Sequence, residues 1–307
     1  MKEKGISVLA VVATIVAAVA VGAGVYLIVT KQAAPGGPQG GGPSENRGPY
    51  ATFLCIHLEP GGATPGGVSW QEYYWPYVMQ IVALADNYNA KLTLHMSPQY
   101  AEYVLQDAAR INIVRGWQKN GHEIGLHHHL PKHQGVWDGY TDNVELVGKK
   151  IKNVEYRGSL ENMMALVREV AAPESVLSAS VGPLEEYQDI DSPTFTEWPL
   201  GIRYHAFGVI DGSVSRPVEN IIRGSRVKVV LHHYLYFGSS PQQPLGQLPA
   251  VQSQFLGAKS DEIVGVNLHD LDYPKDSGAI MRSWLEFLKG KNCSVRTLSD
   301  ILSRYPA

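Results

Sequence analysis

Cysteine is scarce in this sequence, and its scarcity excludes two classes of small protein. Only Cys55 and Cys293 occur among the 307 residues, too few for a disulfide framework and too far apart for a zinc ribbon. Both lie in apolar, strand-like contexts. We therefore expect two buried, small hydrophobic side chains, although a closed barrel could also bring the two sulfur atoms together as a pair.

Positive charge is also in short supply. The formal net charge is -3, and no run of basic residues is longer than Lys149-Lys150. A nucleic-acid partner is therefore not expected, because phosphate binding needs a basic surface. With 44% hydrophobic and 18% charged residues, the chain has enough apolar material for the core of a globular protein.

Charge is missing altogether from residues 5–30, a stretch rich in Ala and Val. Such a stretch is long enough to cross a bilayer as one helix. Lys2 and Lys4 precede it, which favours a cytoplasmic N-terminus and an exported remainder. We predict a membrane helix or signal anchor over 1–30, with the protein tethered at the cell surface. The start also resembles the class III signals of archaea, which are cleaved after a glycine such as Gly5.

Residues 31–49 contain six glycines and four prolines without apolar periodicity. This composition is typical of a flexible linker. From Tyr50 to Ala307 strand-like and helix-like patterns alternate, over a length usual for a (β/α) barrel. We expect an α/β domain over 50–307, with strands at 51–57, 91–96, 122–126, 176–181, 202–210, 226–235, 262–268 and 294–298, and helices at 70–86, 99–120, 160–170 and 280–288.

Histidine is concentrated in one place. Five of the eleven histidines lie in the thirteen residues from 121 to 133, where a helix is expected to end at Asn120-Gly121 and a strand to begin. Nine lie at or just past expected strand ends, where the active sites of parallel barrels are built: His57, His95, His127, His128, His129, His133, His232, His233 and His269. The pattern predicts one histidine-lined pocket.

A carboxylate accompanies these histidines. Glu59 follows His57 by two residues, so both side chains are expected on the same side of an extended segment. One carboxylate with two imidazoles is a common catalytic zinc set, which leaves a position open for water. Glu59 could instead be an ordinary loop carboxylate that caps Gly61-Gly62.

Two stretches resemble the polysaccharide deacetylase (NodB-homology) family. Gly121-His122-Glu123-Ile124-Gly125-Leu126-His127 is similar to the second family motif, and Val264 to Asp270 is similar to the last motif, a strand that ends in Leu-His-Asp. Lys91 to His95 stands in the place of the family's second strand. The resemblance extends in order over residues 50–305.

The resemblance implies a distorted (β/α) barrel that holds one divalent ion, expected to be zinc, through a carboxylate and two histidines. Members of this family hydrolyse N-acetyl and sometimes O-acetyl groups on glycans. It also implies that Glu59 is a metal ligand and that His269 is the general acid.

The first family motif departs from its pattern here. The family has two adjacent aspartates, whereas this chain has Ile56-His57-Leu58-Glu59-Pro60. Either Glu59 binds the metal and His57 or another group is the base, or Glu59 is the base and a histidine replaces the missing ligand. We favour the first, with His57 and His269 as catalytic residues. The family's third-motif arginine has no clear counterpart near Ser180.

The family spacing His-x-x-x-His does not choose one histidine pair. The motif selects His127, whereas the spacing selects His129 with His133. All three are retained as candidate metal ligands together with Glu59. By strand alternation His128 should point away from His127 and His129, and His122 should be structural.

These observations predict a metal-dependent hydrolase that removes acyl groups from an extracytoplasmic glycan. Two alternatives remain open: a catalytically inactive surface protein that binds carbohydrate or metal on the same fold, and a metal-dependent amide hydrolase with a non-sugar substrate. Aromatic side chains could stack on sugar rings, both after the first strand (Trp70, Tyr73, Tyr74, Trp75) and after the histidine cluster (Trp137, Tyr140). The first group could equally pack into the barrel.

Overall fold

The computed structural model describes residues 48–130, 137–145, 147, 155–172, 175–181, 198–209, 214–233 and 245–305. The predicted membrane segment at 1–30, nearly all of the linker and His133 lie outside these ranges. Within them, no helix combines the length and the apolar character needed to span a bilayer.

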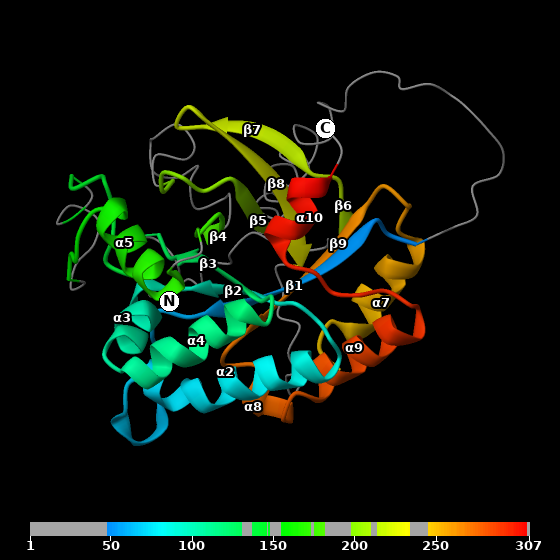
Figure 1. The fold of residues 1–307 in the computed structure, drawn as a ribbon, viewed down its shortest axis with the longest axis horizontal. Coiled ribbons are helices and arrows are strands. Elements are labelled where there is room, and N and C mark those ends of the chain that lie inside the picture. Colours follow the sequence, from blue (N-terminus) through cyan, green and yellow to red (C-terminus); the bar gives the residue numbers. More distant parts are fainter. Residues whose placement is uncertain are drawn as a thin grey trace, which may run out of the picture. The chain divides into compact units, whose positions relative to one another are not determined.

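One nine-stranded sheet forms the centre of the fold (Figure 1). Its strands follow the spatial order β6-β9-β1-β2-β3-β4-β5-β8-β7. The seven inner strands are parallel: β1 (Ala51–Leu58), β2 (Thr93–Met96), β3 (Glu123–His128), β4 (Ser178–Val181), β5 (Tyr204–Val209), β8 (Ser225–His233) and β9 (Ile263–His269). The antiparallel strands β6 (Val214–Ser215) and β7 (Val218–Ile222) form the two edges.

The sheet curls so that β8 approaches β9. A Cβ atom on Gly265 of β9 would lie 2.6 Å from the carbonyl oxygen of Leu231 in β8, so this approach requires glycine. Ser215 of β6 pairs with Ile263 in β9, and its Oγ accepts a hydrogen bond of 3.0 Å from the Leu231 amide. The result is a mixed α/β fold with a barrel-like sheet, as the sequence predicts.

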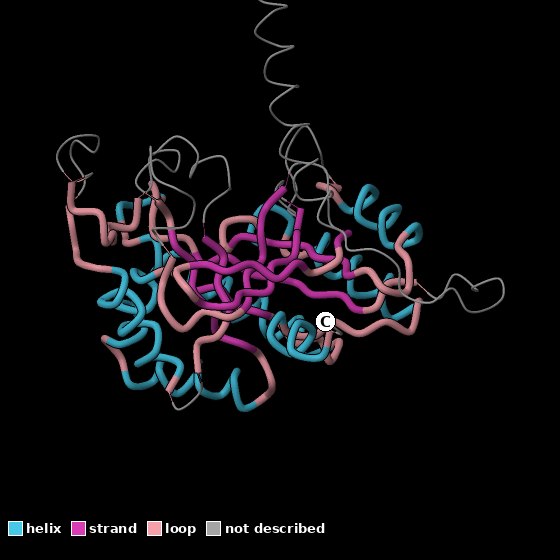
Figure 2. Tube along the Cα trace, turned by 90° about the horizontal axis from the view of Figure 1, so that it is seen from above, coloured by secondary structure: helices cyan, strands magenta, loops and turns pink. Residues whose placement is uncertain are grey.

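Most helices lie along the side of the sheet away from the β7–β8 hairpin (Figures 1 and 2). The helices are α2 (Trp70–Asn87), α3 (Pro98–Leu105), α4 (Ala108–Lys119), α5 (Leu160–Ala171), α7 (Leu248–Gly257), α8 (Tyr273–Asp276), α9 (Ala279–Gly290) and α10 (Leu298–Arg304), with a short 3-10 turn, η1 (Pro65–Gly67). Leu298 and Leu302 of α10 pack against Phe53 and Cys55 of β1. Helix α10 therefore covers the end of the barrel where the parallel strands begin, opposite the end where they finish.

Local sequence explains how the chain enters β3. The Asn120 amide donates to the Gly116 carbonyl oxygen at the end of α4, and Gly121 adopts a left-handed φ of 93°. Glycine tolerates this conformation, which ends the helix as predicted. His122 then directs Nδ1 to the Leu92 amide (3.1 Å) and Nε2 to Asp86 (3.1 Å). It is structural, as expected.

Two expectations about secondary structure are wrong, and one hairpin was missed. The predicted helix 99–120 is two helices, because Asp107 interrupts it and caps α4 through its side chain. The predicted closing strand at 294–298 reduces to one bridge between Thr52 and Val295. The β7–β8 hairpin was not predicted; it turns at Arg223 and Gly224, both with positive φ, as a two-residue hairpin turn requires.

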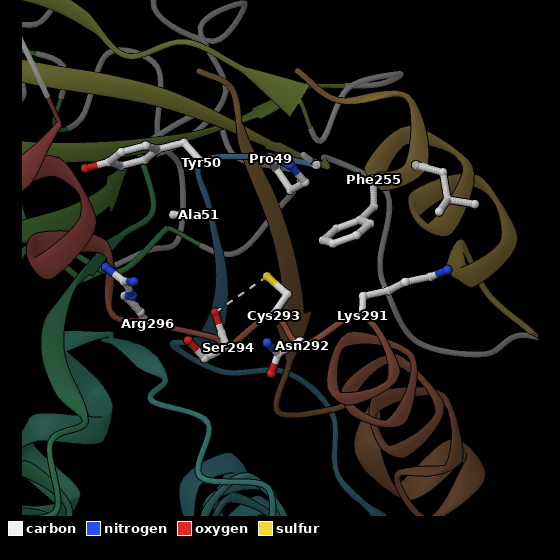
Figure 3. Close-up of a pocket in the computed structure, with 11 residues that line it drawn as sticks. Pro49, Tyr50, Ala51, Phe255, Lys291, Asn292, Cys293, Ser294 and Arg296 are labelled. Carbon is white, nitrogen blue, oxygen red and sulfur yellow. Dashed lines mark hydrogen bonds between the residues drawn. The ribbon is translucent and has the colours of Figure 1, made fainter. Parts of the chain in front are cut away.

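The two cysteines are free, and Cys55 is buried while Cys293 is half-buried. Cys293 lines a pocket of about 440 Å³ with Tyr50, Phe255 and Arg296 (Figure 3). This pocket lies where β1 begins, and no histidine is among its described lining residues. It is therefore separate from the predicted histidine site.

His205 makes the fold sensitive to acid. Burial, and secondarily the nearby His232, lowers the pKa of His205 to about 3, and its Nε2 accepts from the Val181 amide at 3.3 Å. The unfolded chain would bind this proton near pH 6.5. Between pH 6.5 and pH 3 only the unfolded chain binds this proton. The free energy of unfolding is therefore unaffected by His205 above about pH 6.5 and falls by about 5 kcal/mol as the pH approaches 3.

We expect His205→Gln to lose less stability than the wild type between pH 7 and pH 4. Urea unfolding at both pH values measures the difference, with pH 8 as the reference at which both side chains are neutral. Equal losses in the two proteins would contradict this account of the buried imidazole.

Candidate metal centre

The parallel strands bring histidines from distant parts of the sequence to one end of the barrel. In the sheet register, His57 of β1 is opposite His95 of β2 on one side and His269 of β9 on the other. His127 lies near the end of β3. Because these strands run in the same direction, their ends meet at one face.

Glu59 lies at the centre of this face. Its Oε2 is 3.0 Å from His129 Nε2, and its Oε1 is 3.4 Å from His127 Nε2. The two histidine Nε2 atoms are 2.8 Å apart. One carboxylate just past the end of β1 and two imidazoles at and just past the end of β3 thus converge, with potential ligand atoms within 4.8 Å of one another.

The orientation of His127 favours metal binding. Its Nδ1 lies 3.2 Å from the carbonyl oxygen of Ser180, which can only accept a hydrogen bond. In the neutral ring, Nδ1 therefore carries the proton and Nε2 keeps a lone pair directed at Glu59 and His129. A carbonyl that fixes the outer nitrogen in this way is the usual support of a metal-binding histidine.

Electrostatics also suit a cation. Burial alone would raise the pKa of Glu59, but His129 and His127 outweigh it and hold that pKa well below the usual range. Burial lowers the pKa of His127 to about 4, although the Glu59 carboxylate favours the protonated ring and acts in the opposite direction. Near neutral pH the group is thus a carboxylate beside a neutral imidazole, the protonation state that divalent metals need. The donor set fits zinc.

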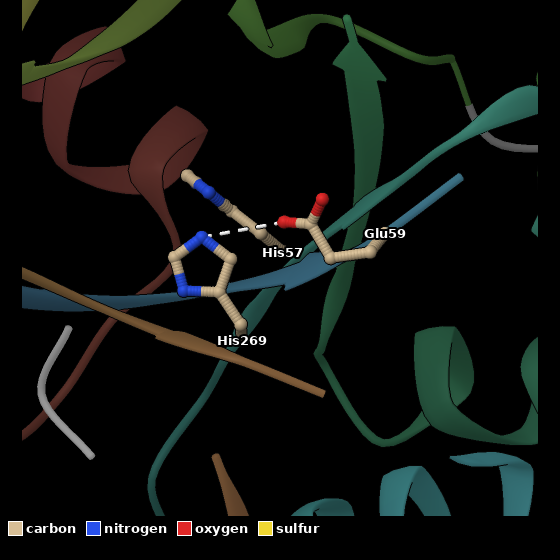
Figure 4. A group of neighbouring side chains, drawn as sticks. All are labelled: His57, Glu59 and His269. Carbon is tan, nitrogen blue, oxygen red and sulfur yellow. Dashed lines mark ion pairs between the residues drawn. The ribbon is translucent and has the colours of Figure 1, made fainter. Parts of the chain in front are cut away.

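His269 approaches Glu59 from β9. Its Nε2 is 3.3 Å from Glu59 Oε1 (Figure 4), and its Nδ1 is 3.4 Å from Asp272 Oδ2. The Lys275 ammonium donates to the other Asp272 oxygen at 2.6 Å. Burial lowers the pKa of His269, but Asp272 and Glu59 more than compensate, so that the pKa is raised. The two carboxylates therefore favour the protonated form of this ring.

His57 lies beneath these groups in the barrel. Its ring stacks on His127 with centroids 4.4 Å apart and contacts His95 and His232 at 5.7 and 5.3 Å. Burial, followed by the neighbouring histidines, holds its pKa well below the usual value. Its Nε2 is buried, and no described residue forms a hydrogen bond with it. His57, Glu59 and His269 form a second group with metal-ligand spacing, which shares Glu59 with the first.

The structure brings together five of the six predicted site residues: His57, Glu59, His127, His129 and His269. The sixth, His133, lies outside the described residues. His127 and His129 are two positions apart and therefore project from the same side of an extended chain. His128 points away, as predicted, and its Nδ1 donates to Asp138 at 2.7 Å.

Sequence reasoning missed Asp138 and Asp270. Asp138 holds the chain just after β3, and Trp137 and Tyr140 beside it are buried rather than available to a sugar. Asp270 accepts from Tyr100 at 2.6 Å and from Trp70 at 2.8 Å. Burial and then Glu59 raise its pKa to about 7. Asp270 is itself the last residue of the Leu-His-Asp motif, and this motif was its only signal in the sequence.

The aromatic residues at the start of α2 divide into two kinds. Trp75 is buried in the core, as the packing interpretation expects. Trp70, Tyr73 and Tyr74 are partly exposed, and the ring centroids of Tyr74 lie 4.4 Å from Trp70 and 4.9 Å from Tyr73. Because Trp70 bonds to Asp270, this group adjoins the metal centre.

Comparison with solved structures identifies the fold. A polysaccharide deacetylase from Mycobacterium smegmatis, so described, is 11% identical with a TM-score of 0.54, over 89% of this chain and 94% of that one. A protein from Pseudomonas aeruginosa with the same description is 14% identical with a TM-score of 0.52, over 82% and 89%. The Puue allantoinase is 15% identical with a TM-score of 0.56, over 88% and 93%.

The chain thus has the fold of the polysaccharide deacetylases, and the family resemblance in its sequence is confirmed at this level. No family model and no curated sequence matches it. At these sequence identities the comparison shows the fold alone, because one fold can carry different reactions.

Proposed function

We propose that this protein is a metal-dependent hydrolase that removes acyl groups, acetyl above all, from an extracytoplasmic glycan. The observation that supports it most strongly is the convergence of Glu59, His127 and His129 at the strand ends of a deacetylase-like barrel. These three residues would hold one divalent ion, expected to be zinc. Such an ion polarises an acyl carbonyl and lowers the pKa of a bound water.

His269 is suited to the role of general acid. Asp272 and Glu59 raise its pKa and so favour the protonated ring, and Asp272 lies 3.4 Å from Nδ1. Nε2 then faces the side of the site where Glu59 lies and can donate to the leaving nitrogen. His57, the predicted base, lies beneath Glu59 with a low pKa; that role stays a prediction.

The glycan substrate is supported by the exposed aromatic group beside the centre. Trp70, Tyr73 and Tyr74 offer ring surfaces next to Asp270 and the metal ligands. Partly exposed aromatic rings next to polar groups are typical of sugar-binding surfaces. We also propose that the protein is anchored in the membrane with its catalytic domain outside the cell. The uncharged segment at 5–30 supports this location.

A second candidate function uses the same centre on a non-sugar amide. The observation that favours it is the similarity to the Puue allantoinase, whose name gives a substrate that is not a glycan. The metal ligands and the acid would keep their roles, and only the walls of the pocket would differ.

The full-length chain, loaded with zinc, should release acetate from an N-acetylated amino-sugar oligomer, and removal of the ion with a chelator should stop the release until zinc is restored. Acetate release that survives complete metal removal would contradict the metal-dependent mechanism. Binding of the oligomer without turnover would favour the inactive binding protein. Turnover of a small cyclic amide alone would favour the second candidate.

A further inference from the structure

The buried carboxylate of Asp138 contacts the backbone of His129, one of the proposed metal ligands. Asp138 Oδ2 accepts two hydrogen bonds, from His128 Nδ1 at 2.7 Å and from the backbone amide of His129 at 2.9 Å. Its other oxygen accepts from the Tyr140 amide at 3.1 Å. Asp138 and His128 are almost completely shielded from solvent.

The position of His129 explains why such support is needed. Parallel pairing of β3 with β2 ends at Leu126, and pairing with β4 ends at His128. His129 follows directly, where these strand ladders no longer hold the backbone. The Asp138 carboxylate accepts its amide proton in place of a neighbouring strand, and the Asp138 amide donates in turn to the His129 carbonyl oxygen at 3.4 Å.

A histidine at position 128 lowers the stability of the fold unless its contact with Asp138 offsets the loss. It points to the side of β3 opposite His127 and His129, and its Nε2 is buried with no hydrogen-bond partner among the described residues. A buried polar atom without a partner costs about 1–3 kcal/mol, which an apolar side chain would avoid. What His128 contributes in return is its bond from Nδ1 to a carboxylate that would otherwise lack a side-chain donor.

We propose that Asp138 and His128 are positioning residues that fix His129 as a metal ligand. The two residues touch neither the ion nor the substrate. They set the direction of the His129 backbone, and through it the distance of Nε2 from Glu59 and His127. Figure 4 shows the neighbouring part of the site, where Glu59 faces His269. The inference rests on the proposed function because it assigns His129 to the metal.

Two substitutions at His128 separate positioning from packing. The amide nitrogen of His128→Asn can replace Nδ1 as the donor to Asp138, although the side chain is smaller. His128→Leu fills the apolar space and removes the donor. If His128 positions His129, Asn preserves zinc affinity and Leu weakens it about 10- to 100-fold, the range for residues that support metal ligands. If His128 only fills space, the order is reversed.

Asp138→Asn should weaken zinc binding about 10- to 100-fold. Competition with a zinc-binding dye measures the affinity in the full-length chain. The matched control is Asp142→Asn, since Asp142 lies nearby and also accepts a backbone bond, from Leu160 at 3.0 Å, but is more exposed. We expect its zinc affinity to stay within about threefold of the wild type. Unchanged affinity in Asp138→Asn would overturn the proposal.

Amide hydrogen exchange tests the same positioning without a metal. In the metal-free chain, the His129 amide should exchange at least about tenfold faster in Asp138→Asn and His128→Leu than in the wild type and Asp142→Asn. If the wild type binds no zinc, the proposed function fails, while slower exchange in the wild type still supports the positioning role. Equal exchange rates in all four proteins would overturn it.

Discussion

Glu59→Gln should release the metal and abolish hydrolysis. Glutamine nearly preserves the volume of the side chain but removes the negative charge that lies 3.0 Å from His129 Nε2 and 3.4 Å from His127 Nε2. Replacing a residue that only supports a metal ligand lowers the metal affinity about 10- to 100-fold. Loss of a ligand itself should therefore weaken zinc binding by at least about 100-fold, with activity reduced in proportion to the bound metal.

The matched control for this variant is Glu102→Gln. Glu102 also carries a carboxylate in close contact with a cation, Arg157 Nη1 at 2.6 Å, but both side chains are partly exposed. Its replacement should leave metal content and acetate release within about threefold of the wild type. A Glu59→Gln protein that keeps its metal while losing turnover would indicate instead that Glu59 is the base.

His269→Ala should separate catalysis from metal binding. As a general acid, His269 is expected to contribute about 10²- to 10⁴-fold to kcat. Zinc affinity should stay within about threefold, because Glu59, His127 and His129 remain. The activity of the wild type should also fall as the pH rises above the raised pKa of His269, and this alkaline decline should be absent from the residual activity of the variant.

The opposite result for His269→Ala is equally informative. His57, Glu59 and His269 also have metal-ligand spacing. If the variant loses its metal, His269 is a ligand and the ion lies on the β9 side of Glu59. The acid would then have to be another group, and the proposed roles of His57 and His269 would both be wrong.

The face that carries the candidate metal centre could be predicted from sequence because it follows from strand direction. Histidines at the ends of expected parallel strands must meet at one face, and β1, β3 and β9 place His57, His127 and His269 there. The period of two along an extended chain also explains why the His127 and His129 rings lie side by side while His128 points away. The family spacing His-x-x-x-His alone could not show that His127 and His129 form the pair.

The supporting residues could not be predicted in the same way. Asp138 reaches His128 because the chain returns to the end of β3 after residues 131–136, and no periodicity encodes that return. Val295 was expected within a strand, yet it forms a single bridge because α10 begins at Leu298 and covers the barrel end. Both depend on tertiary contacts that a local pattern does not contain.

The most direct test of the metal centre is the metal content of the full-length chain, measured by elemental analysis for the wild type, His127→Ala, His129→Ala and His133→Ala. We expect about one zinc-like ion in the wild type and less than a tenth of that in His127→Ala and His129→Ala, with all proteins folded by circular dichroism. His133→Ala shows whether a third imidazole contributes. A folded, metal-free wild type, or full metal content in both His127→Ala and His129→Ala, would contradict the proposed centre.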